Sequence, residues 1–172
     1  MPVMPMRNQL RNLIWFGIAS AFLTASVSAA KQRPSSMAGA ERAIRSLMSR
    51  WFEAYKDLDA KRLAELEAPE VQVVDRFGVL HLASGRTENE KLWSDSFEAV
   101  SRNTVPPAVT IARIRFLGPD VAIVQASWQF REGILLVDGE CVPPFSEIDT
   151  YVVMKSHGVW LVAAHNVQEN KP

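Results

Sequence analysis

Three ionisable side chains in this sequence stand beside apolar runs, where they could move protons. Asp75 ends the run V-Q-V-V-D, Asp149 follows Ile148, and His165 ends the run W-L-V-A-A-H. Removing a carboxyl or imidazole group from water shifts its pKa, and general acid–base catalysis works best with a pKa near the working pH. We therefore predict these three residues as candidate catalytic groups for a proton-transfer reaction.

Asp75 alternates with Val71 and Val73, so the three side chains share one face of an extended segment. If that face borders a pocket, Asp75 is placed to act as a general base. The other interpretation is an aspartate at a strand end that accepts hydrogen bonds from turn amides near Gly78. The sequence leaves both interpretations open.

Asp149 and His165 each allow two interpretations as well. Asp149 is either buried, which requires a partner or a proton, or it faces outward towards Arg113 or Arg115 on a neighbouring strand. An imidazole in an apolar strand must find a hydrogen-bond partner. His165 therefore either faces a cavity as an acid, a base or a ligand contact, with Asp75 as one potential partner, or it is a structural histidine bonded to backbone.

Aromatic side chains recur at helical and strand spacings. Such residues usually form the core, and some of them can also form the apolar wall of a ligand cavity. The candidate ligand-contacting residues are Trp51, Tyr55, Trp93, Phe97, Trp128 and Phe130. The three histidines are too dispersed for a metal site, and no glycine-rich nucleotide motif is present, so we predict no metal and no cofactor.

Hydrophobic periodicity predicts the elements that position these groups. Apolar residues recur every three or four positions from Ala40 to Leu58, which indicates a helix with one buried stripe. Asp59 can cap a second helix that Pro69 stops. Residues 71–76 and 79–83 then form an extended segment and its hairpin partner.

A third helix is predicted to begin at a capping box formed by Thr87 and Glu90. The chain then changes to a period of two, which indicates strands, interrupted by an irregular segment at residues 133–145. The predicted strands cover residues 110–117, 121–130, 147–155 and 159–167. Helices followed by consecutive strands predict an α+β domain with helices packed on one face of a strongly bent antiparallel sheet.

The composition fits one globular domain with an appendage. The chain has 172 residues, of which 48% are hydrophobic, and 19 basic residues balance 19 acidic ones. This balance argues against a nucleic-acid partner, because nucleic-acid binders carry a basic excess. Cys141 is the single cysteine, so an internal disulfide framework is excluded.

The N-terminus has the features of a secretory signal. Basic residues precede a short apolar run, Leu13 to Val27, and small residues follow up to Ala30. We predict a signal peptide at residues 1–30, a linker at 31–38 and the domain at 39–170, and hence a periplasmic or secreted protein. The alternative is an uncleaved N-terminal anchor, which would be the only contact with a membrane.

Five short motifs occur in order between Ala40 and Asn166. They are W-F-E-A-Y-K-D-L-D-A-K-R-L-A-E-L, V-V-D-R-F-G, G-R-T-E-N, R-F-L-G-P-D-V-A-I-V and G-V-W-L-V-A-A-H-N. Together they resemble the nuclear transport factor 2-like superfamily, and within it the SnoaL-like proteins of the SgcJ/EcaC type. The resemblance implies a cone-shaped, cystatin-like α+β barrel with three N-terminal helices on the concave face of its sheet, and a homodimer through the outer sheet face.

Within this superfamily, the ketosteroid isomerases allow a more specific comparison of individual residues. By that resemblance Asp75 falls at the position of the base, Asp149 falls near the later protonated aspartate, and Trp51 stands where a tyrosine would be. An indole N–H donates a hydrogen bond, but it is not a phenol. The resemblance implies a protein that binds a small apolar molecule and catalyses an isomerisation, cyclisation or dehydration. The alternative is a non-catalytic periplasmic module for ligand binding or dimerisation, because this superfamily includes both.

Overall fold

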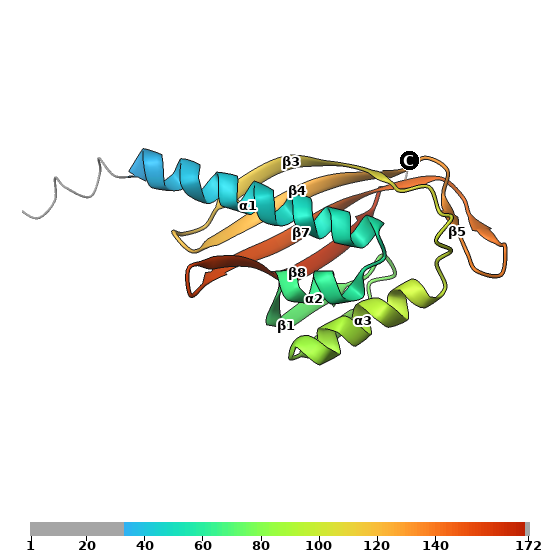
Figure 1. Ribbon diagram of the computed structural model, residues 1–172. Coiled ribbons are helices and arrows are strands. Elements are labelled where there is room, and N and C mark those ends of the chain that lie inside the picture. The colour runs from blue at the N-terminus through green and yellow to red at the C-terminus, as the bar shows by residue number, and fades with distance from the viewer. Residues whose placement is uncertain (1–32, 171–172) are drawn as a thin grey trace, which may run out of the picture. The chain divides into compact units, whose positions relative to one another are not determined.

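The computed structural model describes residues 33–170, with side chains from residue 37 onward. In this part of the chain, three helices lie on one face of a curved sheet (Figure 1). The helices are α1 (Arg33–Lys56), α2 (Ala60–Leu66) and α3 (Arg86–Glu98). The strands are β1 (Glu67–Val74), β2 (Leu80–Ser84), β3 (Ala108–Phe116), β4 (Val121–Phe130), β5 (Ile134–Leu135), β6 (Cys141–Val142), β7 (Phe145–Ser156) and β8 (Val159–Glu169).

The main sheet has six strands in the order β2-β1-β8-β7-β4-β3. All neighbours pair antiparallel except β1 and β8, which run parallel. The prediction of a wholly antiparallel sheet is therefore wrong in this one pairing. A parallel pair needs a long connection between its strands, and here α3 and all the intervening strands supply it. The sheet is open, with β2 and β3 at its edges, so the described residues form an α+β fold with a mixed sheet.

The hydrophobic core lies between the helices and the sheet. β4 buries the apolar residues at its even positions from 122 to 130, as the alternation predicted. α1 supplies the other side of the core. Its large buried residues are Ile44, Leu47, Met48, Trp51 and Phe52. Burial of side chains of this size contributes about 1.5–3 kcal/mol each, so α1 is fixed firmly against the sheet.

The predicted boundary between the second helix and the strand is correct at its start and wrong at its end. Asp59 caps α2, because its carboxylate accepts a hydrogen bond from the Arg62 backbone N–H at 3.0 Å. The helix already ends at Leu66, and Pro69 lies inside β1. Pro69 is tolerated there because the pairing of β1 with β8 is irregular over this segment.

The predicted capping box of the third helix is also wrong. α3 begins one residue before Thr87, after Gly85, which has a φ of 99° and provides no side-chain cap. Glu88, and not Glu90, reaches back and accepts a hydrogen bond from the Ser84 backbone N–H at 2.8 Å. The positive φ of Gly85 shifts the start of the helix, so the carboxylate that satisfies an amide is two residues earlier than expected.

Two further segments differ from the sequence interpretation. α1 begins at Arg33 and so covers most of the segment predicted as a linker. Residues 133–145, predicted as irregular, contain the two-stranded ribbon of β5 and β6. The predicted signal at residues 1–30 lies outside the described residues. No helix within residues 33–170 has the length and apolar character needed to cross a membrane.

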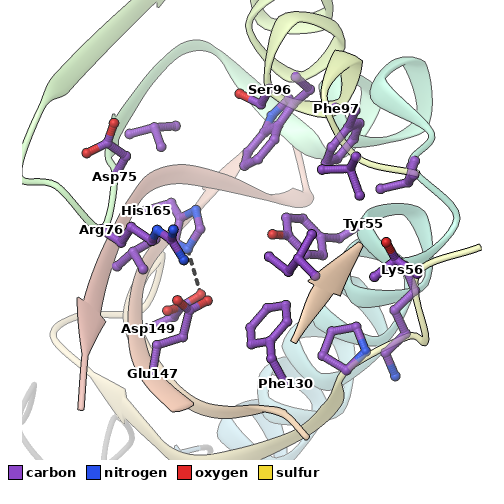
Figure 2. A pocket seen from close by; sticks show the side chains of 18 of the residues that line it. Tyr55, Lys56, Asp75, Arg76, Ser96, Phe97, Phe130, Glu147, Asp149 and His165 are labelled. Atoms are coloured by element: carbon purple, nitrogen blue, oxygen red, sulfur yellow. Dashed lines mark hydrogen bonds and ion pairs between the residues drawn. The ribbon is translucent and has the colours of Figure 1, made fainter. Parts of the chain in front are cut away.

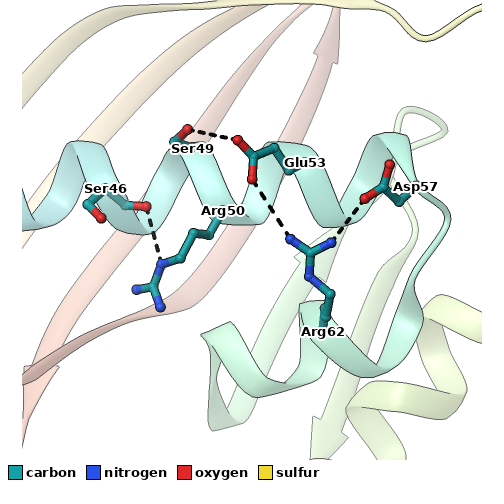
Figure 3. A network of polar contacts seen from close by, with 6 residues as sticks. All are labelled: Ser46, Ser49, Arg50, Glu53, Asp57 and Arg62. Atoms are coloured by element: carbon teal, nitrogen blue, oxygen red, sulfur yellow. Dashed lines mark hydrogen bonds and ion pairs between the residues drawn. The ribbon is translucent and has the colours of Figure 1, made fainter.

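The solvent-facing side of α1 is connected to α2 by charged side chains (Figure 3). Nη1 of Arg62 lies 3.0 Å from Oδ2 of Asp57, and its Nη2 lies 3.8 Å from Oε2 of Glu53. Exposed ion pairs of this kind contribute about 1 kcal/mol at most. They help to hold the angle between the two helices on the side that faces away from the sheet.

Candidate functional site

A cavity of about 340 Å³ lies between the helices and the sheet. Its wall is mainly apolar and comes from α1, α3, β4, β7, β8 and the turn after β1 (Figure 2). Four of the six predicted ligand-contacting residues line it: Tyr55, Trp93, Phe97 and Phe130. A largely apolar hollow with a few convergent polar groups is the usual form of a small-molecule site.

His165 and Asp149 form a buried pair at this cavity. Tyr151 and His165 are directly paired across β7 and β8, and Asp149 lies two residues before Tyr151 on the same face. Nε2 of His165 is 2.8 Å from Oδ2 of Asp149, and the two side chains are only 4% and 2% exposed (Figure 2). A buried carboxyl group needs such a partner. The outward orientation of Asp149 is thereby excluded, and the partner of His165 is Asp149 instead of Asp75.

A chain of hydrogen bonds fixes the orientation of this pair. Oδ2 of Asp149 also accepts from the Tyr151 hydroxyl at 2.9 Å, and that hydroxyl accepts from Nε1 of Trp128 at 3.2 Å. Burial, together with the charge of Asp149, raises the pKa of Tyr151, so its hydroxyl stays protonated and donates. Because this oxygen accepts from Tyr151, Nε2 of His165 is assigned as the donor to it, and a neutral imidazole in this tautomer has a lone pair on Nδ1.

Two acceptor atoms of the pair are unused. Nδ1 of His165 and Oδ1 of Asp149 are buried and have no hydrogen-bond partner among the described residues. Buried polar atoms without a partner cost roughly 1–3 kcal/mol each, and in native proteins they often mark functional groups. The pair thus keeps unused hydrogen-bonding capacity at residues that line the cavity.

Three aromatic rings hold the His165 imidazole in place. The Tyr151 ring stacks on it at a centroid distance of 4.5 Å and an interplanar angle of 6°. Trp51 meets it edge-on at 5.3 Å, and Trp93 lies roughly parallel to it at 6.1 Å. Packing on several sides leaves the imidazole little freedom to rotate, as a preorganised acid–base group requires.

Glu147 is a second buried carboxyl group at the cavity, and the sequence analysis missed it. It precedes Asp149 by two residues on β7 and is 6% exposed. Burial and then the charge of Asp149 raise the pKa of Glu147 to about 8, although the nearby Arg76 guanidinium lowers it. At neutral pH Glu147 is therefore mostly protonated and can donate a hydrogen bond. The two-residue spacing of E-I-D was the signal that could have identified it.

The Tyr55 hydroxyl is another neutral donor at the cavity. Burial, followed by the charges of Glu147 and Asp149, raises the pKa of Tyr55, so the phenol keeps its proton. The hydroxyl makes no hydrogen bond with any residue in the described part of the chain. Figure 2 shows Tyr55 across the cavity from His165 and Asp149.

Asp75 lies at the edge of the cavity and is occupied by its own turn. Its Oδ1 accepts from the backbone N–H groups of Phe77 and Val79 at 2.9 Å each, and its Oδ2 lies 2.9 Å from Nε2 of His81. The side chain is 31% exposed. Burial raises the pKa of Asp75, but the bonds from His81 and the two amides outweigh this effect, and the net shift is downward. The turn interpretation therefore describes this residue, and a carboxylate so fully bonded is a weak base.

Trp51 and Trp128, the other two predicted contacts, do not line the cavity. Nε1 of Trp51 donates to Glu67 at 3.2 Å, and Nε1 of Trp93 donates to both oxygens of the same carboxyl group at 2.9 Å. The indole N–H of Trp51 is thus engaged and is not free to donate to a ligand. Glu67 is completely buried, and burial raises its pKa to about 7 despite the bonds from Trp93 and Trp51.

No group of three or more His, Cys, Asp or Glu side chains within the described residues is arranged to hold a metal ion. Cys141 lies on β6 and is exposed. The polar side chains that line the cavity carry carboxyl, imidazole, phenol, hydroxyl, ammonium and guanidinium groups.

Comparison with known proteins gave matches among solved structures alone, since no family model and no curated protein matches this chain. A ketosteroid isomerase-like protein from Erwinia carotovora atroseptica superposes with a TM-score of 0.65 at 16% identity, over 76% of this chain and 96% of that one. A type 2 hexachlorocyclohexane dehydrochlorinase gives 0.65 at 17%, over 80% and 89%. A Caulobacter vibrioides protein with a cystatin-like fold gives 0.62 at 19%, over 77% and 90%.

Identities this low establish the fold and not the activity. The SnoaL-like, SgcJ/EcaC-type subfamily stays a prediction from the motifs. The described residues have the α+β cone fold of the nuclear transport factor 2-like superfamily, as the resemblance in the sequence implied.

Proposed function

We propose that this protein binds a small, largely apolar molecule in the cavity and transfers a proton within it, as an isomerisation, cyclisation or dehydration requires. The observation that carries the proposal is the buried His165–Asp149 pair at an apolar cavity, with Nδ1 of His165 free of any partner among the described residues.

In the proposed reaction His165 acts as the general base in place of Asp75. Nδ1 takes a proton from a carbon next to a carbonyl group, and the electrons of the C–H bond pass to the carbonyl oxygen. Asp149 stabilises the imidazolium that forms. Tyr55 and Glu147, both protonated at neutral pH, donate to the developing oxyanion. The proton then returns from Nδ1 to another carbon of the same molecule.

Hydrogen–deuterium exchange tests this mechanism without knowledge of the natural substrate. Enolisable ketones that suit the cavity, such as 2-indanone and 2-tetralone, would be followed by NMR in D₂O. We expect the protein to accelerate exchange above the buffer rate and His165→Gln to abolish the acceleration. Asp149→Asn should reduce it by roughly 10²-fold or more, and the exposed-turn variant His157→Gln should match the wild type. Exchange that persists at the wild-type rate in His165→Gln would refute the proposal.

The alternative is a module that binds a ligand without reaction, and the apolar lining alone would suit that role. Ketone binding, measured by chemical-shift changes, with no exchange above the buffer rate would support this second function. Such a result would leave the cavity as the site and would remove the catalytic roles of His165 and Asp149.

We also propose that the protein is exported to the periplasm or secreted. The support is the signal-like composition of residues 1–30. N-terminal sequencing of protein isolated from its host should begin near Lys31 if the signal is cleaved. A sequence that begins at Met1 would indicate an uncleaved anchor.

A homodimer through the outer face of the sheet is the third part of the proposal. Ile148 and Met154 lie on the outer face of β7 and are 42% and 43% exposed, while Arg113 and Arg115 lie exposed on β3. Such a mixed apolar and charged face resembles an association surface. Light scattering should report a dimer for the wild type and a monomer for Ile148→Glu, and a monomeric wild type would exclude this part.

A further inference from the structure

Arg76 is a cavity residue whose guanidinium group has no ion-pair partner among the described residues. It follows Asp75 in the turn between β1 and β2, is half-buried and lines the cavity. Its guanidinium carbon lies 4.9 Å from the ring centroid of Phe77 and 5.1 Å from that of Phe145. Among the described residues it forms no ion pair, because no carboxylate oxygen lies within 4.0 Å of its nitrogens. The aromatic rings therefore position a guanidinium group whose donors are free.

The geometry of a guanidinium group determines what it binds best. Its five N–H donors form a rigid planar fork that matches the two oxygens of a carboxylate. Figure 2 shows Arg76 on the same side of the cavity as His165, with Glu147 and Asp149 close by. An anion held by Arg76 would consequently lie next to the His165–Asp149 pair.

The charges at the cavity favour an anion over a cation. Glu147 interacts with Arg76, and burial raises the pKa of Glu147 to about 8, so near neutral pH it is mostly an uncharged donor. Oδ2 of Asp149 accepts from two donors, whereas its Oδ1 is buried without a partner among the described residues. Lys56 and Arg102 also line the cavity and add positive charge. An amine would meet the three cations Arg76, Lys56 and Arg102, and the Asp75 carboxylate at the cavity edge already accepts from His81 and two turn amides.

The rest of the wall limits the size and polarity of the ligand. The cavity of about 340 Å³ is lined opposite Arg76 by the rings of Tyr55, Phe97 and Phe130. Rings of this kind accept an apolar or aromatic body.

We propose that the cavity takes a small monocarboxylic acid with an aromatic or aliphatic body, its carboxylate held by Arg76 and its body lying along Phe97 and Phe130. This assignment names the substrate class of the proposed function and rests on that function for the reaction only. Binding of a carboxylate by Arg76 can be tested independently of any proton-transfer reaction.

A matched set of ligands tests the assignment: 3-phenylpropionate, its neutral amide and the cationic 3-phenylpropylamine, titrated at pH 7 and followed by calorimetry. The full-length protein should bind the acid at least about tenfold more tightly than the amide and the amine, since hydrogen bonds to charged groups are the stronger ones. Arg76→Gln should remove this preference and leave amide binding unchanged. Arg76→Lys should retain part of the preference, and the surface variant Arg50→Gln all of it.

Equal affinity for acid and amide, tighter binding of the amine, or an unchanged preference in Arg76→Gln would each overturn the assignment. Circular dichroism of each variant shows that it is folded. His165→Gln separates the two proposals, because it should abolish proton exchange and keep the acid preference within about twofold. If the protein lacks proton exchange but keeps the acid preference, only the proposed reaction is refuted. If it lacks the acid preference but keeps proton exchange, only the assigned ligand class is refuted.

Discussion

Glu67 offers a direct measurement of what burial does to a carboxyl group in this fold. It is completely buried beside Trp51 and Trp93, with no cation among its described partners. Burial raises its pKa from 4.5 to about 7. The unfolded chain therefore ionises this group at a lower pH than the folded protein does. Below pH 4.5 both states hold the proton and the full stability is present, and that contribution is lost as the pH rises through about 7.

The size of the effect follows from the shift. At 1.36 kcal/mol per pKa unit, a rise from 4.5 to about 7 corresponds to roughly 3 kcal/mol of stability lost across this range. Glu67→Gln cannot ionise, so this part of the pH dependence should disappear in the variant. The amide of the variant gains an N–H₂ group without a partner, which adds a constant cost of about 1–3 kcal/mol at every pH. The test therefore depends on how the difference in unfolding free energy changes with pH, and not on its constant part.

The assay is urea unfolding at pH 5, 6, 7 and 8, followed by far-UV circular dichroism. The difference in free energy of unfolding, variant minus wild type, should become more positive by about 2.5 kcal/mol from pH 5 to pH 8. Glu147 and Asp75 titrate in both proteins and cancel in the difference. The exposed neighbour Glu65→Gln serves as a control and should give a flat difference. A flat difference for Glu67→Gln would refute the account of this group.

Three further predictions address the site and the fold. Tyr151→Phe removes one donor from Asp149 and should lower ketone exchange about tenfold while the protein stays folded; an unchanged exchange rate would show that this hydrogen bond does not position the pair. Affinity for 3-phenylpropionate, measured by calorimetry, should fall as the pH rises through about 8, because ionised Glu147 repels a carboxylate. Glu147→Gln should flatten this pH profile. The other ionisable groups that act on Glu147 or face it are Tyr55, Arg76, Asp149 and Glu169. Gly133→Ala should cost more than about 2 kcal/mol in urea unfolding, because its Cβ would collide with a backbone carbonyl of β6 at a φ of 73°, whereas Gly139→Ala, with open space around it, should cost only the backbone strain of about 1 kcal/mol.

Periodic patterns and short-range chemistry were sufficient for much of the fold. The even positions of β4 are buried as the alternation predicted, and Asp59 caps α2. These features depend on residues close in the chain, where spacing alone determines which side chains share a face. The motifs resembling the nuclear transport factor 2-like superfamily added the arrangement of helices against a curved sheet, and the solved structures confirm that arrangement.

The composition of the site was decided by contacts between distant segments. Asp149 and His165 are 16 residues apart, and the register of β7 against β8 places them at hydrogen-bond distance. The same sequence spacing would have separated them after a one-residue slip, because each slip moves a side chain to the other face. Asp75, by contrast, has its hydrogen-bond partners close in the sequence, in the turn after β1 and at His81 on β2.

The sequence by itself determined which residues could carry a proton and which faces of each element would be apolar. Only the tertiary structure decided which carboxyl groups meet a partner, which stay protonated in the interior and which remain solvated. The physical reason is that a pKa depends on desolvation and on neighbours across the sheet, and both are properties of three-dimensional packing that no local pattern encodes.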